Sequence, residues 1–139
     1  MDEAILEPDN IRNKIESDEF AGFMGIRLLE LKEGYSKMSM TVTDRMVNFH
    51  NVAHGAAIFS LADAAFAAAG NSHGKKAVAL SVTINYCAPA RKGDRLVAEA
   101  FEESLGGRTG LYRMVVRSEG GKLIASSQGT VYRKPEESI

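Results

Sequence analysis

The pattern of hydrophobic and polar positions along the chain predicts one long helix and about six strands. Residues 55–69 read GAAIFSLADAAFAAA, with apolar side chains on every face of a helix. A helix that is hydrophobic all round is a buried one. Gly70 and Asn71 follow it as a typical C-terminal helix signal, and the charged segment 11–20 predicts a shorter helix near the start of the chain.

Six further segments have the composition of strands. In the clearest of them, 77–87, alternation places a set of large side chains on one face: Val78, Leu80, Val82, Ile84 and Tyr86. Glycine pairs separate the last three segments, which is typical of antiparallel hairpins. The expected strands are 26–33, 35–43, 77–87, 95–105, 109–119 and 122–133.

Two stretches have no regular period. Residues 44–54 predict a loop that brings polar groups to the start of the long helix, and 134–139 predict a frayed tail. An all-apolar helix needs cover on every side, which a curved sheet or a second sheet would supply. The sequence therefore predicts one α+β domain over residues 1–139, with an antiparallel sheet of about six strands around a central helix.

Composition narrows the class of protein. The chain has 139 residues, 45% of them hydrophobic and 25% charged, and a formal net charge of −1, unlike a dedicated nucleic-acid binder. The single cysteine, Cys87, forms no internal disulfide, and the acidic start MDEAILEPDN lacks the apolar core of a signal peptide. The apolar helix is too short to span a bilayer. We expect a cytoplasmic protein without nucleic-acid or membrane partners.

Asp63 is the only charged residue of the apolar helix. A buried carboxylate is costly unless it is paired or hydrogen-bonded. No Lys or Arg lies three or four residues away on the helix to neutralise it. Because perturbed titratable groups cluster at functional sites, Asp63 is the leading candidate for a catalytic residue.

The start of the same helix supplies a second candidate. Helix N-termini expose unpaired N–H groups and a partial positive charge, and Gly55 has no side chain to keep a ligand from its backbone. Gly55 and Asp63 are eight residues apart, or about 12 Å along a helix, whereas a reacting carbonyl must lie about 3 Å from both groups. If both are catalytic, the site must join two protomers across a two-fold axis.

The run NFHNVAHGAAIFSLADAAFAAAGN, followed by ALSVTINYCAPARKGD, resembles the hotdog-fold acyl-CoA thioesterases of the phenylacetate-degradation type. The resemblance covers about residues 25–133. It rests on Asn-x5-His-Gly, an aspartate eight residues after that glycine, and a serine on the next strand. It implies a hotdog fold, intersubunit sites and thioester hydrolysis with coenzyme A as part of the substrate and no separate cofactor. We expect an obligate homodimer and, beyond it, a homotetramer. Ala56 departs from the second glycine of many relatives.

The resemblance also implies roles for five residues. Asp63 activates water or attacks the thioester, Gly55 is the oxyanion donor through its N–H, and Ser81 helps to position the water. Asn48 and His54 orient the thioester and hold the loop. Structural alternatives remain open: Asp63 as a capped carboxylate, Asn48 bonded to its own loop, and His54 as a helix cap or loop brace, which we favour over direct chemistry.

Coenzyme A needs cations for its phosphates. Arg91 and Lys92, in the turn after the serine-bearing strand, are the first candidates, and Arg108 is an alternative, as is the pair Arg133 and Lys134. Exposed basic residues in turns are just as often only solvated.

Other candidate chemistry is weaker. His50 and His54 are four residues apart but lie in a loop with no third ligand at a suitable offset, so we expect no metal site. Cys87 has no paired histidine motif and is expected to pack as a small apolar residue. The aromatic and methionine residues that could line an acyl pocket could equally belong to the core: Met46, Phe49, Phe59 and Phe66.

Two further functions remain alternatives to hydrolysis. A hotdog dehydratase or hydratase would use a histidine as its principal base. The acid on its helix would lie much further from that histidine than Asp63 lies from His54, so the spacing in this chain argues against it. A non-catalytic acyl-CoA-binding protein would keep the pocket without turnover, although it would be free to lose the costly aspartate. The sequence does not name the acyl group.

Overall fold

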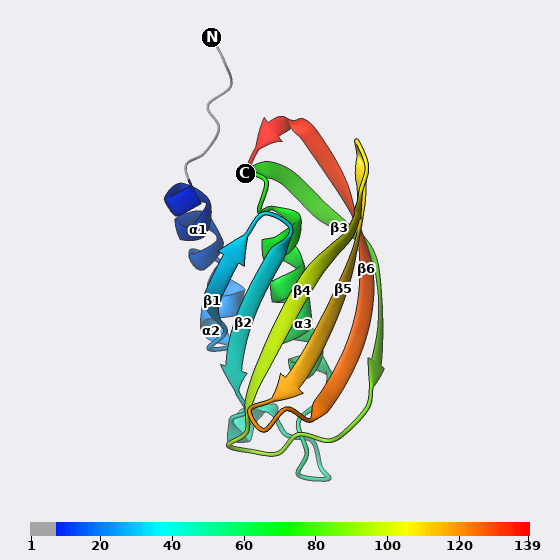
Figure 1. The fold of residues 1–139 in the computed structure, drawn as a ribbon. Helices are drawn as coiled ribbons and strands as arrows, with labels where there is room; N and C mark the ends of the chain where they lie inside the picture. The colour runs from blue at the N-terminus through cyan, green and yellow to red at the C-terminus, as the bar shows by residue number, and fades with distance from the viewer. Residues whose placement is uncertain (1–7) are drawn as a thin grey trace.

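A six-stranded antiparallel sheet curves around one long helix in the computed structural model, which describes residues 8–139 (Figure 1). The strand order is β1-β2-β4-β5-β6-β3. The predicted α+β architecture is therefore confirmed, with a single curved sheet that covers one side of the helix. The strands are β1 Arg27–Lys32, β2 Tyr35–Thr41, β3 Lys75–Tyr86, β4 Arg95–Leu105, β5 Thr109–Ser118 and β6 Leu123–Ser138.

The central helix, α3, runs from Gly55 to Gly70 and ends as predicted, with Asn71 as its C-cap. Its sheet-facing side is fully packed, and Leu61, Ala62 and Ala65 have no exposed surface. The opposite side remains partly accessible in the protomer, which corrects the expectation of burial on every face. We call this accessible strip the small-residue stripe: Ala56, Ser60, Asp63, Ala64 and Ala67.

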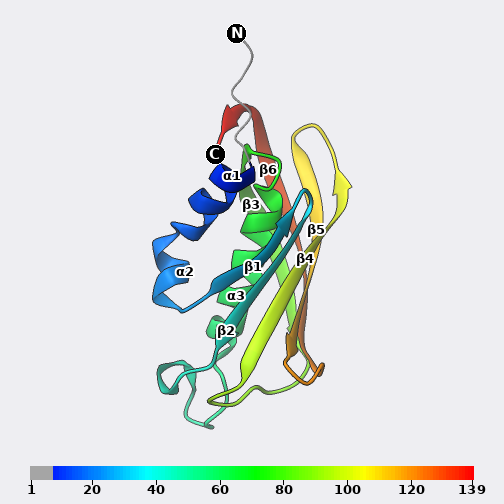
Figure 2. The same cartoon turned by 60° about the vertical axis from the view of Figure 1, so that its left-hand side comes forward.

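Two short helices precede the sheet. The expected single helix over 11–20 is instead α1, Pro8–Glu16, and α2, Glu19–Phe23. The break follows from capping, because the Asp18 carboxylate accepts the Ala21 N–H at 2.9 Å and starts a new helix. α1 lies beside β1, and α2 lies against α3 (Figure 2). The signal-peptide argument was made on residues 1–10, of which 1–7 lie outside the described residues.

The C-terminal tail is ordered as a strand, so the prediction of a frayed tail was wrong. Ser138 pairs with Lys75 at the start of β3, and Lys134 pairs with Lys76. Glu137 lies 3.7 Å from the Lys76 ammonium. These pairings join segments far apart in the sequence, so local composition gave no sign of them.

The third strand is an edge of the sheet, and its alternation is broken. The β3–β6 register shifts between Ala79 and Ser81, a β-bulge that reverses which positions face the core. Val82 and Ile84 pack against the core as predicted, whereas Leu80 and Val78 are 59% and 48% exposed. The single-face alternation predicted for 77–87 therefore holds only after the bulge.

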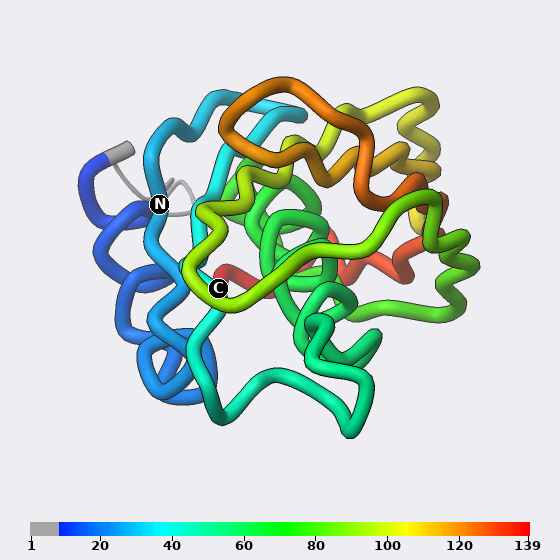
Figure 3. Tube along the Cα trace, turned by 90° about the horizontal axis from the view of Figure 1, so that it is seen from below, coloured from blue at the N-terminus to red at the C-terminus, as the bar shows by residue number. Residues whose placement is uncertain are grey.

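Seen from below, the helix lies inside the curve of the sheet (Figure 3). The loop that contains the short 3-10 helix η1, Asp44–Met46, leads into the start of α3 at the same end of the molecule as the 87–94 turn. Among residues 8–139, no helix combines the length and the hydropathy that a membrane crossing requires.

Candidate active site

His54 satisfies nearly all the free amides at the start of α3. Its Nδ1 accepts the Ala56 N–H at 3.1 Å, and its backbone oxygen accepts those of Ala57 at 2.9 Å and Ile58 at 3.3 Å. The interpretation of His54 as a helix cap is thus confirmed. Among the described residues, the Gly55 N–H is the amide of this first turn that has no acceptor.

The free Gly55 N–H is the feature expected of an oxyanion donor. It lies at the positive end of a 16-residue helix dipole. Gly55 is half-buried and so remains reachable. A negative oxygen at this point would gain both a hydrogen bond and the helix field.

Asn48 organises the loop that precedes the helix. Its Oδ1 accepts the N–H of His50 at 2.8 Å and of Val52 at 3.3 Å, while its own N–H donates to the Val52 oxygen at 2.8 Å. The loop tip reaches a left-handed backbone at Asn51, with φ of 65°. The alternative in which Asn48 bonds to its own loop is therefore confirmed for its oxygen.

Asp63 lies on the small-residue stripe, half-buried and without a hydrogen bond or ion pair to any described residue. Burial raises the pKa of its carboxyl above the ordinary value of 3.8, and repulsion from the Asp18 carboxylate raises it further. The protomer thus holds a carboxylate that its own residues leave uncompensated. The capped structural carboxylate considered from the sequence is not found among residues 8–139.

Neither Ser81 nor Gly55 forms a hydrogen bond with Asp63 in the described part of the protomer. The Ser81 hydroxyl lies 3.0 Å from that of Thr130, on the opposite face of β3 from Val82. Gly55 and Asp63 belong to one unbroken helix, so their separation remains about 12 Å along the axis. One protomer therefore cannot apply both groups to one carbonyl.

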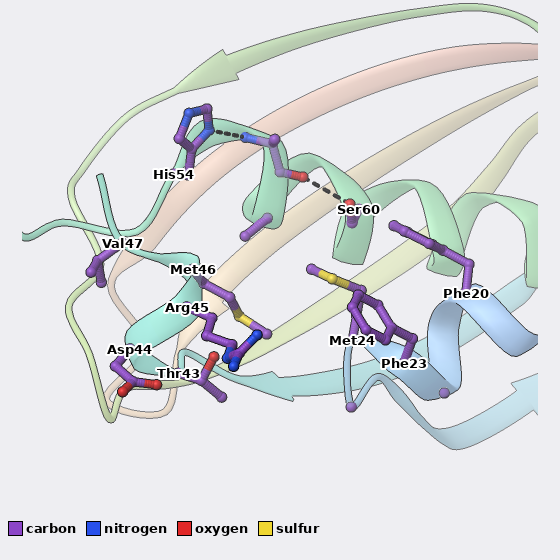
Figure 4. Close-up of a pocket in the computed structure, with 14 residues that line it drawn as sticks. Phe20, Phe23, Met24, Thr43, Asp44, Arg45, Met46, Val47, His54 and Ser60 are labelled. Carbon is purple, nitrogen blue, oxygen red and sulfur yellow. Dashed lines mark hydrogen bonds between the residues drawn. The ribbon is translucent and has the colours of Figure 1, made fainter. Parts of the chain in front are cut away.

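An open groove of about 990 Å³ lies against the start of α3 (Figure 4). Its polar positions include His54 and Ser60, which donates to the Ala56 oxygen at 2.8 Å. Its apolar walls come from α2, the chain just after it, η1 and α3. They include Phe20, Phe23, Met24, Met46, Val47 and Ala57.

Of the side chains considered for an acyl pocket, Met46 lines this groove. Phe66 belongs instead to the core, packed edge-on against Tyr112 with ring centroids 5.7 Å apart. Phe49 is 91% exposed at the loop tip, and Phe59 is half-buried on α3 outside the groove lining.

The basic candidates lie at opposite ends of the protomer (Figure 1). Arg91 and Lys92 occupy the turn beside the start of α3, where the Ala53 N–H donates to the Ala90 oxygen at 2.7 Å. Arg108 lies in the β4–β5 turn at the far end and bonds to Glu136 at 3.1 Å. Within one chain, the structure therefore brings Arg91 and Lys92, but not Arg108, to the Gly55 end.

Sequence reasoning missed three contributors to this region. Phe20 and Phe23 are 59% and 83% exposed over the groove. The sequence placed Phe20 only at the end of a charged helix and gave Phe23 no role. Tyr86 donates to the Gly55 oxygen at 3.0 Å. No local pattern indicates a contact between two residues that lie 31 positions apart. The one weak signal for Tyr86 is that an aromatic residue ends an alternating strand.

Comparison with known sequences identifies the family to which a protein with this fold and site belongs. The thioesterase superfamily model matches residues 50–125. Acyl-coenzyme A thioesterase PaaI of Escherichia coli (strain K12) is 39% identical over 124 residues, 89% of each chain. A protein of Archaeoglobus fulgidus, named among the esterases, is 50% identical over 121 residues, 87% of this chain and 79% of the relative.

Solved structures agree with this assignment. Escherichia coli PaaI, from the phenylacetic acid degradation operon, superposes with a TM-score of 0.88 at 38% identity and 91% coverage of each chain. The TT0310 protein of Thermus thermophilus gives 0.81 at 42% identity, covering 84% of this chain and 98% of that one. The chain belongs to the thioesterase superfamily and has the hotdog fold.

Proposed function

We propose that this protein is an acyl-CoA thioesterase, which hydrolyses an acyl-CoA to a carboxylic acid and free coenzyme A. The observation that supports this most is that each protomer holds two groups without a hydrogen-bond partner, one at the start of α3 and one further along it. The Gly55 N–H has no acceptor and the Asp63 carboxylate has no donor among the described residues. A thioester carbonyl and its attacking water would satisfy both.

In the proposed reaction, the Gly55 N–H of one protomer polarises the thioester carbonyl and stabilises the oxyanion that forms. Asp63 of a second protomer removes a proton from water, or attacks the carbonyl itself. When Asp63 acts as a base, the C–S bond breaks, the proton it removed passes to the sulfur, and coenzyme A leaves as the thiol. When Asp63 attacks the carbonyl, coenzyme A leaves as the thiolate and takes a proton from solvent, and water then hydrolyses the acyl anhydride to release the acid and restore the carboxylate. The groove that contains Met46 and Phe23 is a suitable place for the acyl group.

We propose a homodimer as the active unit. Among residues 8–139, β3 pairs only with β6 and its other edge is open, with Leu80 and Val78 exposed along the strand. An open apolar edge strand is a hazard unless something covers it. Pairing with β3 of a second copy would cover this edge and join the two sheets into one. It would also lay the two small-residue stripes together, which would carry each Asp63 toward the other protomer's Gly55.

The function is tested by thiol release over a panel of aryl and alkyl CoA thioesters, with Asp63→Asn as the key variant. Loss of a general base typically costs about 10²–10⁴ in rate, and the isosteric amide leaves the stripe unchanged in shape. Free thiol from the wild type and at least a hundredfold loss in the variant are expected. Loss of water from a 3-hydroxyacyl-CoA without thiol release, or binding without either reaction, would overturn the proposal.

The role of Arg91 has a separate test. If its guanidinium binds the coenzyme A phosphates, Arg91→Ala raises KM for a CoA thioester by roughly tenfold, the range of one charge-assisted hydrogen bond. The same variant should leave KM unchanged for a pantetheine thioester of the same acyl group, which lacks the nucleotide. Equal effects on both substrates would exclude this role.

A further inference from the structure

Tyr86, the last residue of β3, is held directly against the first residue of α3. Its hydroxyl donates to the Gly55 backbone oxygen at 3.0 Å. A Cβ added at Gly55 would lie 3.1 Å from the ring carbon Cζ and 3.3 Å from the hydroxyl oxygen. The phenol thus bonds to the residue that carries the free N–H and covers its α-carbon.

The contact adds an anchor from the sheet to the first turn of the helix, which His54 caps from the loop side. Helix ends fray because their terminal groups lack intrahelical partners. Here the Gly55 carbonyl, which the helix pattern pairs with the Phe59 N–H, receives a second donor from a strand 31 residues away. β3 is in turn fixed by β6, where Tyr86 pairs with Ala125. The sheet therefore anchors the Gly55 carbonyl and, through the ring against the α-carbon, limits how the preceding peptide that carries the Gly55 N–H can turn.

The same contact limits the space for a side chain at position 55. Gly55 has no left-handed φ that would demand glycine, and its N1 position accepts most residues. The steric reason is the Tyr86 ring, since a distance of 3.1 Å is shorter than an ordinary Cβ contact. Tyr86 and Gly55 thus act as one unit.

We propose that Tyr86 is a positioning residue, which holds the Gly55 N–H in the orientation needed to bind the oxyanion. The inference rests on the proposed function of Gly55. A positioning role predicts an effect on kcat, because accurate placement of a donor matters most in the transition state. KM and the affinity for coenzyme A are expected to stay within about twofold of wild type.

The first test compares Tyr86→Phe with Tyr35→Phe, both as full-length protein. Each variant removes one hydrogen-bonded phenol hydroxyl, but Tyr35 bonds to Glu99 at the other end of the sheet. Tyr86→Phe should lower kcat about five- to tenfold, as expected for one neutral hydrogen bond, while Tyr35→Phe should not. A fall in melting temperature or a change in KM with kcat unchanged would assign Tyr86 a merely structural role.

A double-mutant cycle tests the steric half of the argument. Gly55→Ala should lower kcat about tenfold in the wild-type background but less than twofold beside Tyr86→Ala, where the new methyl has room. Equal losses in the two backgrounds would show that the ring does not constrain position 55.

Amide hydrogen exchange separates this inference from the proposed function. If the wild type cleaves no thioester, the function fails, yet Tyr86→Phe must still speed exchange at the hydrogen-bonded Ala56 and Phe59 amides relative to the Tyr35→Phe control. If Asp63→Asn abolishes turnover but Tyr86→Phe leaves both kcat and exchange unchanged, the function stands and the role of Tyr86 is refuted.

Discussion

Replacing Gly55 with proline removes the one backbone group on which the proposed chemistry depends. Proline is well tolerated at the first helical position because the N–H lost there has no intrahelical partner, and the Gly55 N–H has no other acceptor among the described residues. His54 already has φ of −62° and ψ of 139°, the extended conformation that a residue before proline prefers. The substitution therefore sacrifices no hydrogen bond within the protomer.

The matched control is Gly55→Ala. Both substitutions place a Cβ near the Tyr86 ring, 3.1 Å from Cζ, and only proline deletes the N–H. One oxyanion donor is worth about 10²–10³ in kcat, or roughly 2.7–4 kcal/mol, so the proline variant should be at least a hundredfold slower than the alanine variant. Proline also restricts the unfolded chain, which stabilises the folded state by about 0.4–1 kcal/mol where its geometry fits. This difference is small, so the two melting temperatures should be similar.

The assay is thiol release under saturating substrate, with melting temperature and far-UV circular dichroism to confirm the fold. A proline variant within tenfold of the alanine variant would refute Gly55 as the oxyanion donor. A proline variant that fails to fold would contradict the structural claim that position 55 has the geometry of a first helical residue.

Two further predictions concern charge and packing. Activity that needs ionised Asp63 falls as the pH drops through its raised pKa, so the acid limb lies above 3.8. Asp18→Asn, which keeps a good α2 cap, should move that limb to lower pH, and a stationary limb in a pH–rate profile would contradict the assignment. Gly129→Ala places a Cβ 2.8 Å from the Phe66 ring and should cost about 1–3 kcal/mol in thermal unfolding. Gly120→Ala, with open space around it, should cost little, and equal losses would refute the packing argument.

Much of the fold follows from local pattern. The run of alanines in 55–69 and its Gly70 stop predict α3, and the glycine turns predict the β4–β5–β6 hairpins, because these signals act over a few residues. The bulge at Leu80 and the strand formed by 134–138 depend on β3–β6 register, which is set by pairing across the sheet. Periodicity within one segment does not record such pairing.

The site divides in the same way. Gly55 and Asp63 are visible in the sequence because a glycine at a helix start and a lone charge in an apolar helix violate local expectation. Tyr86 violates nothing in its own strand, and its contact with Gly55 exists only once the sheet curves around α3. Asp63 is also less buried in the protomer than its surroundings in the sequence predict, because the small-residue stripe faces outward rather than toward a second sheet.

Mixed oligomers test the shared site most directly. Subunits carrying Gly55→Pro and subunits carrying Asp63→Asn, each inactive alone, are unfolded together, refolded in equal amounts and assayed for thiol release. In a hybrid dimer one site combines the intact Gly55 of one chain with the intact Asp63 of the other, so random mixing should restore about one quarter of wild-type activity. Activity that stays at the level of the separate variants, with hybrids demonstrated by native mass spectrometry, would contradict a site built from two protomers.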